Sequence, residues 1–470
     1  MSVILDTPRW AARRRPLDRL EARVVRLQLQ REDHDLVPIA DALRYAISLA
    51  RCTDVCSAEN QDVNLADPLA PFASWLRDAL ESRLERAESL WSLARELPEI
   101  TRRTREARAE ALTRIDRDSL EAEVTVRTLT VASGGGGGAG YVYPGVYEQL
   151  ERNGFIPDLM VGTSIGALMS LFRARRRRWD GAPLVSAARE LSWSRIFRVL
   201  ESSSRYGLPA TLRLYLQAAL GKIFQHESGR PTTLADLEIP LLIVAAGITV
   251  DALKHDLNWY EHLLDEEVDR RGWRSSFRGA VKALSVLREF LSRRDALVEV
   301  VLGRADGTQD FDVLDAAGFS AAIPGVIHYD VLREDQRMKR ILDHLYGTAG
   351  ITRLGEGGMV SNVPARIAWE TMVSGRYGRR NTFVLALDCF APNPRSLAWV
   401  PLQQAVRTAN VETDRLFADA YVTFPHTLSP VNLVPSIRDA LLAIRWGRDA
   451  MAPHLPFLSA MMRPIPVLHG

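Results

Sequence analysis

Residues 158–168, DLMVGTSIGAL, indicate the fold and the chemistry of the chain more strongly than any other stretch. The apolar residues before Gly162 predict a buried strand, and the small apolar residues after Ser164 predict a helix. Between them, GTSIG has the form G-x-S-x-G, which at a strand-to-helix turn is typical of a nucleophile elbow. The glycines permit a strained turn that lifts the serine hydroxyl above the sheet, and the N-terminus of the helix favours negative charge there. We therefore predict that Ser164 is a nucleophile and that Gly162 and Gly166 are the elbow glycines.

A glycine-rich loop lies upstream of this elbow. Residues 124–131, VTVRTLTV, alternate as a strand does, and SGGGGGAG follows at 133–140. Acyl transfer needs N–H donors aimed at the oxyanion of the tetrahedral intermediate, and residues without side chains let backbone N–H groups approach a bound oxygen closely. The loop is therefore a candidate oxyanion hole, with donors among Gly135, Gly136, Gly137, Gly138 and Gly140.

The same loop has a competing interpretation as a dinucleotide site. Gly135, Gly137 and Gly140 also satisfy G-x-G-x-x-G. That fingerprint needs an acidic residue at the end of the second strand, where it binds the ribose. Asp158 instead precedes its strand, and the far end of the strand is the GTS turn. The pattern therefore disfavours a nicotinamide or flavin cofactor.

A third motif, LGEGGMVSNVP at 354–364, offers a general base. A carboxylate beside two glycines can sit in a tight loop and take a proton from a serine on another loop, without an intervening histidine. Glu356 is the candidate. Asp388, at the end of an apolar strand, and His328 are weaker candidates, for which a structural role is favoured.

Strand, glycine-rich turn, helix, strand, tight turn and helix follow one another from residue 124 onward, and this order is typical of a parallel α/β sheet. Residues 240–246 and 382–387 are continuous apolar runs, as expected for strands covered on both faces. We expect a helical N-terminal extension at 1–124, an α/β catalytic domain at 125–400 with a helical insertion at 251–298, and a helical C-terminal extension at 401–470.

Composition excludes several classes of protein. The 470 residues are 47% apolar and 25% charged with a formal net charge of +2, which is ordinary for a globular protein and disfavours a nucleic-acid partner. The three cysteines offer neither a disulfide framework nor a zinc group, so we expect no metal. The apolar runs fall short of the roughly 18 to 20 residues that span a bilayer. The expected location is the cytoplasm, with peripheral contact to a membrane left open.

Together, in this order, the three motifs resemble the patatin-like phospholipase family, whose pattern is a glycine-rich oxyanion loop, a G-x-S-x-G elbow and a distal D-G-G or D-G-A. Residues 141–145 (YVYPG), 320–325 (SAAIPG) and 362–364 (NVP) match flanking elements. The resemblance covers roughly residues 126–390. It implies a three-layer fold with a mostly parallel central sheet, and a Ser–Asp type dyad in which Ser164 attacks an ester carbonyl and Glu356 takes its proton. It also implies a phospholipid or other acyl ester substrate and no cofactor.

Two departures from the family pattern leave a second hypothesis open. Ala139 stands where the family usually has Arg or Lys, and Glu356 stands where it has Asp. A glutamate keeps the charge but adds one methylene, and small errors in geometry can cost orders of magnitude in rate. The chain is therefore expected to be a lipid acyl hydrolase. The alternative is a catalytically impaired relative that binds a lipid, or a protein partner of its helical extensions.

Overall fold

A seven-stranded, mostly parallel sheet forms the centre of the computed structural model, which describes residues 9–30, 35–86, 90–199, 205–208, 210–249, 297–391 and 411–468. Its parallel part has the order β7 (Leu241–Ile248), β4 (Leu159–Thr163), β3 (Thr128–Ser133), β11 (Thr382–Asp388) and β12 (Ala420–Thr423). Two strands, β8 (Leu297–Leu302) and β10 (Arg353–Gly355), pair antiparallel with β7.

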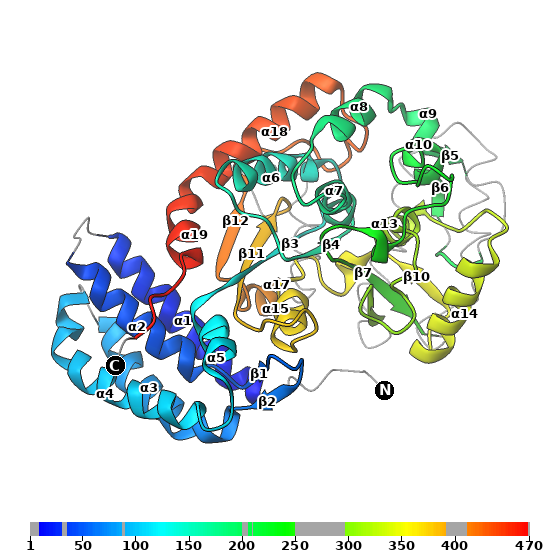
Figure 1. The fold of residues 1–470 in the computed structure, drawn as a ribbon. Helices are drawn as coiled ribbons and strands as arrows, with labels where there is room; N and C mark the ends of the chain where they lie inside the picture. Colours follow the sequence, from blue (N-terminus) through cyan, green and yellow to red (C-terminus); the bar gives the residue numbers. More distant parts are fainter. Residues whose placement is uncertain are drawn as a thin grey trace.

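Helices cover both faces of this sheet, so that the domain has three layers (Figure 1). Alternate residues of β11 show the division. Phe383, Leu385 and Leu387 pack with the helices of one face, whereas Val384 and Ala386 pack with those of the other. The first layer contains α6 (Tyr143–Arg152), α7 (Ile165–Ala174) and α13 (Val313–Ser320), and the second contains α15 (Ala365–Val373). Burial on both faces explains the continuous apolar runs, and the expected three-layer α/β fold is confirmed.

Strand β7 brings together the two segments that carry the predicted nucleophile and base. Strand β4 pairs with its first half, where Thr163 lies opposite Val244, and β10 pairs with its second half, where Gly355 lies opposite Ala246. Because β8 occupies residues 243–248 of β7 from one side, β4 and β10 must share the other edge. They approach each other end to end along that edge, since β4 is parallel and β10 antiparallel to β7. The residues that follow them, Ser164 and Glu356, therefore meet.

The N-terminal part is a helical unit with its own apolar core, which lies apart from the central sheet in Figure 1. Its helices are α1 (Arg9–Leu29), α2 (Leu36–Ala50), α3 (Ala66–Arg86), α4 (Leu97–Ala111) and α5 (Arg117–Thr125). The sequence did not predict its hairpin, β1 (Asp54–Cys56) with β2 (Asp62–Asn64). The expected strand at 124–131 begins only at Thr128, because the start of the alternating run completes α5.

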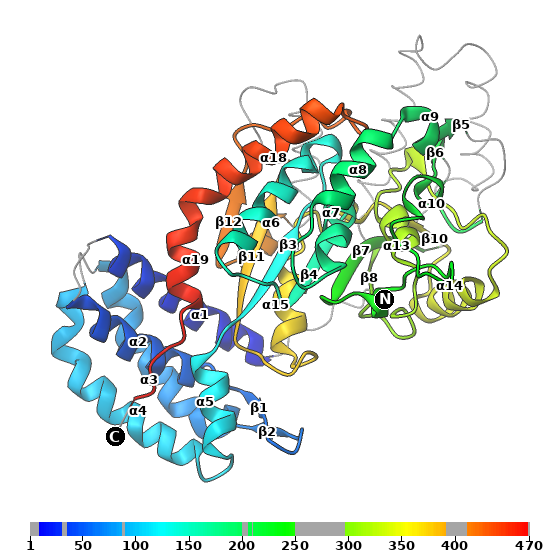
Figure 2. The same cartoon turned by 45° about the horizontal axis from the view of Figure 1, so that its top comes forward.

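The C-terminal part is less purely helical than expected. Strand β12 extends the central sheet parallel to β11, so the sheet continues beyond residue 400. Helix α18 (Ile437–Met451) packs along α6, and α19 (Leu455–Met462) reaches α1, as Figure 2 also shows. The predicted insertion at 251–298 lies outside the described residues except for 297 and 298, which begin β8.

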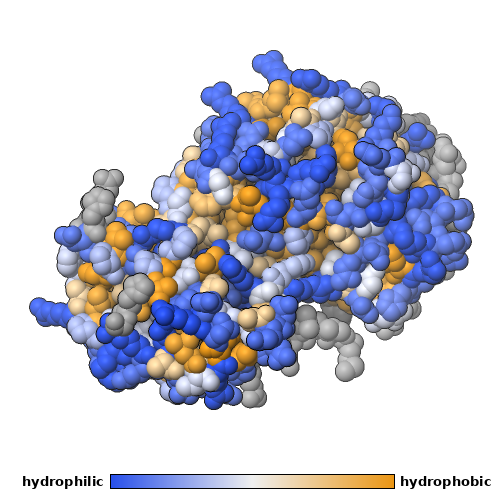
Figure 3. Space-filling view, in the orientation of Figure 1, coloured by the Kyte–Doolittle hydropathy of each residue, from blue (hydrophilic) through white to orange (hydrophobic). Residues whose placement is uncertain are grey.

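A second, smaller sheet of β5 (Phe197–Val199), β6 (Ala210–Leu214) and β9 (Gly325–His328) lies beyond β10. Among the described residues, no helix is both long enough and apolar enough to cross a bilayer. Figure 3 shows apolar surface at the top of the molecule, where α18 lies, and this helix exposes Leu441 and Leu442.

Buried ion pairs join α1 to the rest of the molecule. Glu21 of α1 is fully buried and pairs with Arg44 at 3.2 Å, Arg51 at 2.7 Å and Arg127 at 2.5 Å. Burial alone would raise the pKa of Glu21, but the guanidinium groups of Arg127, Arg51 and Arg44 outweigh it and hold the pKa at about 2. Since Arg127 directly precedes β3, this carboxylate links the helical unit to the central sheet.

Replacing Glu21 should destabilise the whole protein. In Glu21→Ala, three buried guanidinium groups lose their shared counter-charge, so we expect the free energy of unfolding to fall by about 3 to 5 kcal/mol in denaturant titrations. Glu99→Ala removes an exposed carboxylate of α4 that also contacts two arginines, and it should leave the unfolding midpoint unchanged. Equal midpoints for both variants would show that the Glu21 cluster does not stabilise the fold.

Candidate active site

Ser164 occupies a strained turn between β4 and α7. Its backbone angles are φ 55° and ψ −126°, and among the described non-glycine residues only Asn60 shares a positive φ. The amide of Ser164 donates to Ser320 Oγ at 2.8 Å, and that hydroxyl in turn donates to the carbonyl of Val244 at 2.5 Å. Such strain persists only where surrounding contacts over-determine it, and Ser320 supplies one of them. The turn has the geometry of a nucleophile elbow.

The two elbow glycines are required by close approach to backbone atoms. A Cβ added at Gly166 would lie 2.2 Å from the carbonyl oxygen of Ser133, and one added at Gly162 would lie 2.5 Å from Cα of Ala167. Both distances are far below van der Waals contact. Helix α7 can therefore begin tightly against β3 and β4 only because these positions lack side chains.

Glu356 lies within hydrogen-bond reach of the serine. Ser164 Oγ donates to Glu356 Oε2 at 3.0 Å, and the amide of Gly358 donates to Oε1 at 3.1 Å. Burial raises the pKa of Glu356 to about 7, against the opposing effect of these two hydrogen bonds. A carboxyl group with this pKa, in contact with a hydroxyl, can accept a proton near neutral pH.

The glycine-rich loop lies beside this pair. A Cβ added at Gly135 would lie 3.2 Å from Cβ of Ser164, so the start of the loop is next to the nucleophile. The amide of Gly135 donates to the carbonyl of Asn362 at 3.0 Å, and that of Gly138 donates to the carbonyl of Pro430 at 2.9 Å. Gly140 lies within the 3-10 turn Gly137–Val142.

These contacts narrow the set of candidate oxyanion donors. Within the described part of the chain, the amides of Gly136 and Gly137 donate no hydrogen bond to the backbone of another segment. Their φ angles, 155° and 56°, lie in the region that favours glycine. Gly136 and Gly137 are thus better donor candidates than Gly135 and Gly138, whose amides already donate to carbonyls of other segments.

The other acidic and basic candidates have structural partners. His328 is buried, with Nδ1 2.8 Å from the carbonyl of Leu208 and Nε2 3.2 Å from Arg213. Asp388 accepts hydrogen bonds from Phe390 N and Tyr421 Oη at 2.9 and 2.8 Å.

Asp158, the acid considered for a dinucleotide site, accepts a hydrogen bond from the amide of Leu129 at 2.8 Å and so joins the starts of β3 and β4. Within the described residues, none of these three side chains forms a hydrogen bond with Ser164.

Sequence reasoning did not single out Ser320, which accepts a hydrogen bond from the amide of Ser164, or the buried pair Ser361 and Asp414, whose side chains are hydrogen-bonded. Ser320 is the first residue of SAAIPG, and Ser361 directly precedes NVP. Both motifs drew notice only because they resemble the family pattern. Asp414 lies in α17 (Val411–Arg415), within the segment assigned to the C-terminal extension, and no pattern in the sequence marked it.

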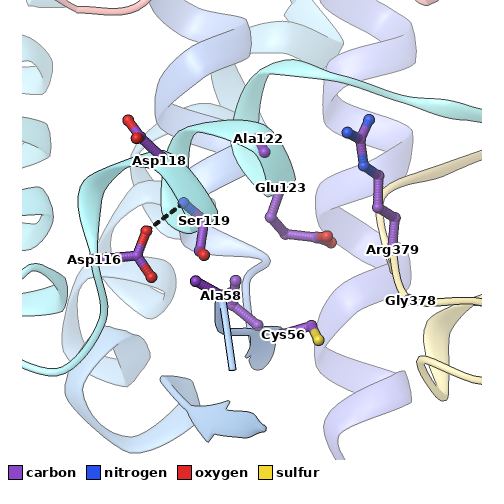
Figure 4. Close-up of a pocket in the computed structure, with 10 residues that line it drawn as sticks. Cys56, Ala58, Asp116, Asp118, Ser119, Ala122, Glu123, Gly378 and Arg379 are labelled. Atoms are coloured by element: carbon purple, nitrogen blue, oxygen red, sulfur yellow. Dashed lines mark hydrogen bonds between the residues drawn. The ribbon is translucent and has the colours of Figure 1, made fainter. Parts of the chain in front are cut away.

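Two surface pockets of the described residues lie away from this site. One is bounded by α5, the end of the β1 strand and the turn at Gly378 and Arg379 (Figure 4). In it, Asp116 caps α5 by accepting a hydrogen bond from Ser119 N at 2.8 Å. The other lies between α1, β12 and α19. No group of His, Cys, Asp and Glu suited to a metal ion is found in the described ranges.

Comparison with known proteins identifies the family of the chain. A family model for patatin-like phospholipases matches residues 131–369, somewhat more than half of the chain, and the match includes both Ser164 and Glu356. The comparison with curated proteins finds no match.

A methyl group at the second elbow glycine should disrupt the site. In Gly166→Ala, the added Cβ overlaps two backbone carbonyl oxygens, so we expect a loss of about 1 to 3 kcal/mol in unfolding free energy. Gly347→Ala is the matched control, because Gly347 lies within α14 (Gln336–Ala349) with no atom within 4 Å of the new Cβ. It should stabilise the protein by about 0.5 to 1 kcal/mol through helix propensity. Equal stability of the two variants would contradict the tight packing of α7 on β3.

Proposed function

Because the chain belongs to the patatin-like phospholipase family, a family of lipid acyl hydrolases, we propose that it hydrolyses carboxylic esters of a phospholipid or other acyl lipid with Ser164 as nucleophile and Glu356 as general base. The observation that carries this proposal is the 3.0 Å contact between Ser164 Oγ and Glu356 Oε2. It favours an active dyad over an impaired site, because the residue that departs from the family pattern still reaches the serine.

The reaction divides into two steps. In the first, Glu356 takes the proton of Ser164 Oγ as that oxygen attacks the ester carbonyl, and the oxyanion forms beside the amides of Gly136 and Gly137. The tetrahedral intermediate collapses, the protonated Glu356 returns its proton to the leaving alkoxide, and an acyl-serine remains. In the second, Glu356 takes a proton from water, the hydroxide attacks the acyl-serine, and the proton returns to Ser164 as the carboxylic acid leaves. Neither step needs a metal or an organic cofactor.

A lipid substrate implies contact with a membrane surface. Helix α18 is the candidate region, since Leu441 and Leu442 are exposed beside the exposed Arg438 and Arg445. Apolar side chains flanked by arginine suit the interface of a bilayer. Asp449 pairs with Arg445 and weakens the positive charge of this face. We therefore propose reversible, peripheral docking.

A fluorophosphonate probe tests the nucleophile. The wild-type protein should be labelled covalently, and Ser164→Ala should lose all labelling while keeping its unfolding midpoint, because the probe reacts only with an activated serine. Ser320→Ala retains Ser164 but loses the hydroxyl that accepts a hydrogen bond from the Ser164 amide. This variant should be labelled more slowly. A well-folded wild-type protein that is not labelled would reject the hydrolase and favour a lipid-binding or partner-binding role.

The pH dependence of turnover tests the base. Since Glu356 must be ionised to accept a proton, ester hydrolysis should rise with pH through an apparent pKa of about 7. Glu356→Gln should lose at least about a hundredfold in kcat together with this inflection. Glu356→Asp withdraws the carboxylate by about a bond length and should lose about tenfold, because misplaced groups catalyse poorly.

Stability provides the control for these variants. The pKa of Glu356 is raised above its ordinary value of 4.5, so its contribution to stability is complete below pH 4.5 and is lost as pH rises through 7. Glu356→Gln should therefore be at least as stable as the wild type at pH 8. An inflection near pH 4.5 would show that this carboxyl group is not the buried base, and unchanged turnover in Glu356→Gln would reject the dyad.

A further inference from the structure

The loop from Glu356 to Asn362 contacts every other part of the candidate site. Glu356 accepts the hydrogen bond from Ser164, and the carbonyl of Ser361 accepts one from Thr163 Oγ1 at 2.9 Å. The carbonyl of Asn362 accepts a hydrogen bond from the amide of Gly135 at 3.0 Å. This loop therefore sets the distance between the base, the nucleophile and the glycine-rich loop. We call residues 356–362 the base loop.

Ser361 closes the base loop on itself and also ties it to a distant segment. Its amide donates to the carbonyl of Gly357 at 3.0 Å, which forms the turn behind Glu356. Its hydroxyl donates to Asp414 Oδ2 at 2.5 Å. Ser361 and Asp414 are both fully buried, so water does not compete for this bond.

Asp414 is itself held by a charged cluster. Arg366, at the start of α15, lies 3.4 Å from Asp414 Oδ1 through its Nε and also pairs with Glu299 and Glu370. This cluster joins α15, β8 and α17 on the face of the sheet that the base loop covers. Asp414 lies outside residues 131–369, the range of the family match.

We propose that Asp414 is a positioning residue: through Ser361 it holds the base loop, and with it Glu356, at the distance from Ser164 that proton transfer needs. The inference rests on the proposed function, because it concerns the geometry of the same dyad. It assigns a catalytic contribution to α17, which is linked to the base loop through Ser361.

The contribution of Asp414 lies in its acceptor oxygen more than in its charge. Burial raises the pKa of Asp414 to about 7, against the opposing hydrogen bond from Ser361 and the charge of Arg366, and Glu299 and Glu370 raise it further. The carboxyl group can therefore lose its charge near neutral pH and still accept from Ser361. Asparagine has the same shape and keeps an acceptor oxygen, so it is the conservative replacement.

The test compares Asp414→Ala, Asp414→Asn and Ser361→Ala with the wild type, using a soluble acyl ester and counting active sites with the fluorophosphonate probe. Asp414→Ala and Ser361→Ala should lower kcat per labelled site about 10-fold to 100-fold with KM within about twofold, because displacement of a catalytic group slows chemistry more than binding. Asp414→Asn should remain within about threefold of the wild type. Glu412→Ala, an exposed carboxylate of the same helix, is the matched control and should change nothing.

The outcomes separate positioning from stability and from failure of the proposed function. If Asp414→Ala lowers only the amount of folded, labelled protein and leaves kcat per labelled site unchanged, the proposal is wrong. If the wild type neither turns over nor becomes labelled, the hydrolase function fails, and hydrogen exchange then decides the positioning claim. Faster exchange of the amides of Gly358 and Ser361 in Asp414→Ala, with no change in Glu412→Ala, would support the proposal, and unchanged exchange in both would overturn it.

Discussion

One edge of β7 carries the geometry on which the candidate site depends. Strands β4 and β10 pair with the same edge from opposite directions and stop two residues apart, at Val244 and Ala246. At about 3.3 Å per residue, their ends are separated by roughly 7 Å along β7. The next residue of each strand must therefore project into a common space, and those residues are Ser164 and Glu356. A shift of β10 by one residue along β7 would turn the base to the other face of the sheet.

The surroundings of Glu356 explain the raised pKa of its carboxyl group. Glu356 has no arginine or lysine partner in the recorded contacts of the described residues, only the Gly358 amide and the Ser164 hydroxyl. Neutral donors offset only part of the cost of burial, so the pKa rises. Glu21 is fully buried, but it is surrounded by three guanidinium groups and has a pKa of about 2. The two glutamates therefore differ in charge near neutral pH: Glu21 stays ionised within its arginine cluster, whereas Glu356, the proposed base, can gain and lose a proton.

Sequence reasoning predicted the parts whose signal is local. The elbow, the glycine-rich loop and the buried strands follow from patterns within a few residues, and the structure places the elbow and the loop next to each other. The motifs that resemble the family pattern also predicted Glu356 as a residue of the candidate site. Reasoning failed where the signal is non-local. Asp414 looks like any surface carboxylate in its sequence context, and only the return of the chain to form β12 buries it against Ser361. The alternating pattern at 124–131 is ambiguous within its local sequence, because its first residues are compatible with both the end of a helix and the start of a strand.

Both extensions act on the same helix of the catalytic domain. Helix α15 begins at Ala365, three residues after Asn362, the last residue of the base loop. Its Trp369 donates through Nε1 to Asp18 of α1 at 3.0 Å. On the same helix, Arg366 contacts Asp414 of the C-terminal segment. Asp18 is buried and also accepts a hydrogen bond from Arg51, which directly follows α2. Because a rigid helix transmits displacement along its length, the N-terminal unit and the C-terminal segment together fix where the base loop ends. The segments outside the family match therefore pack directly on the helix that follows the proposed base.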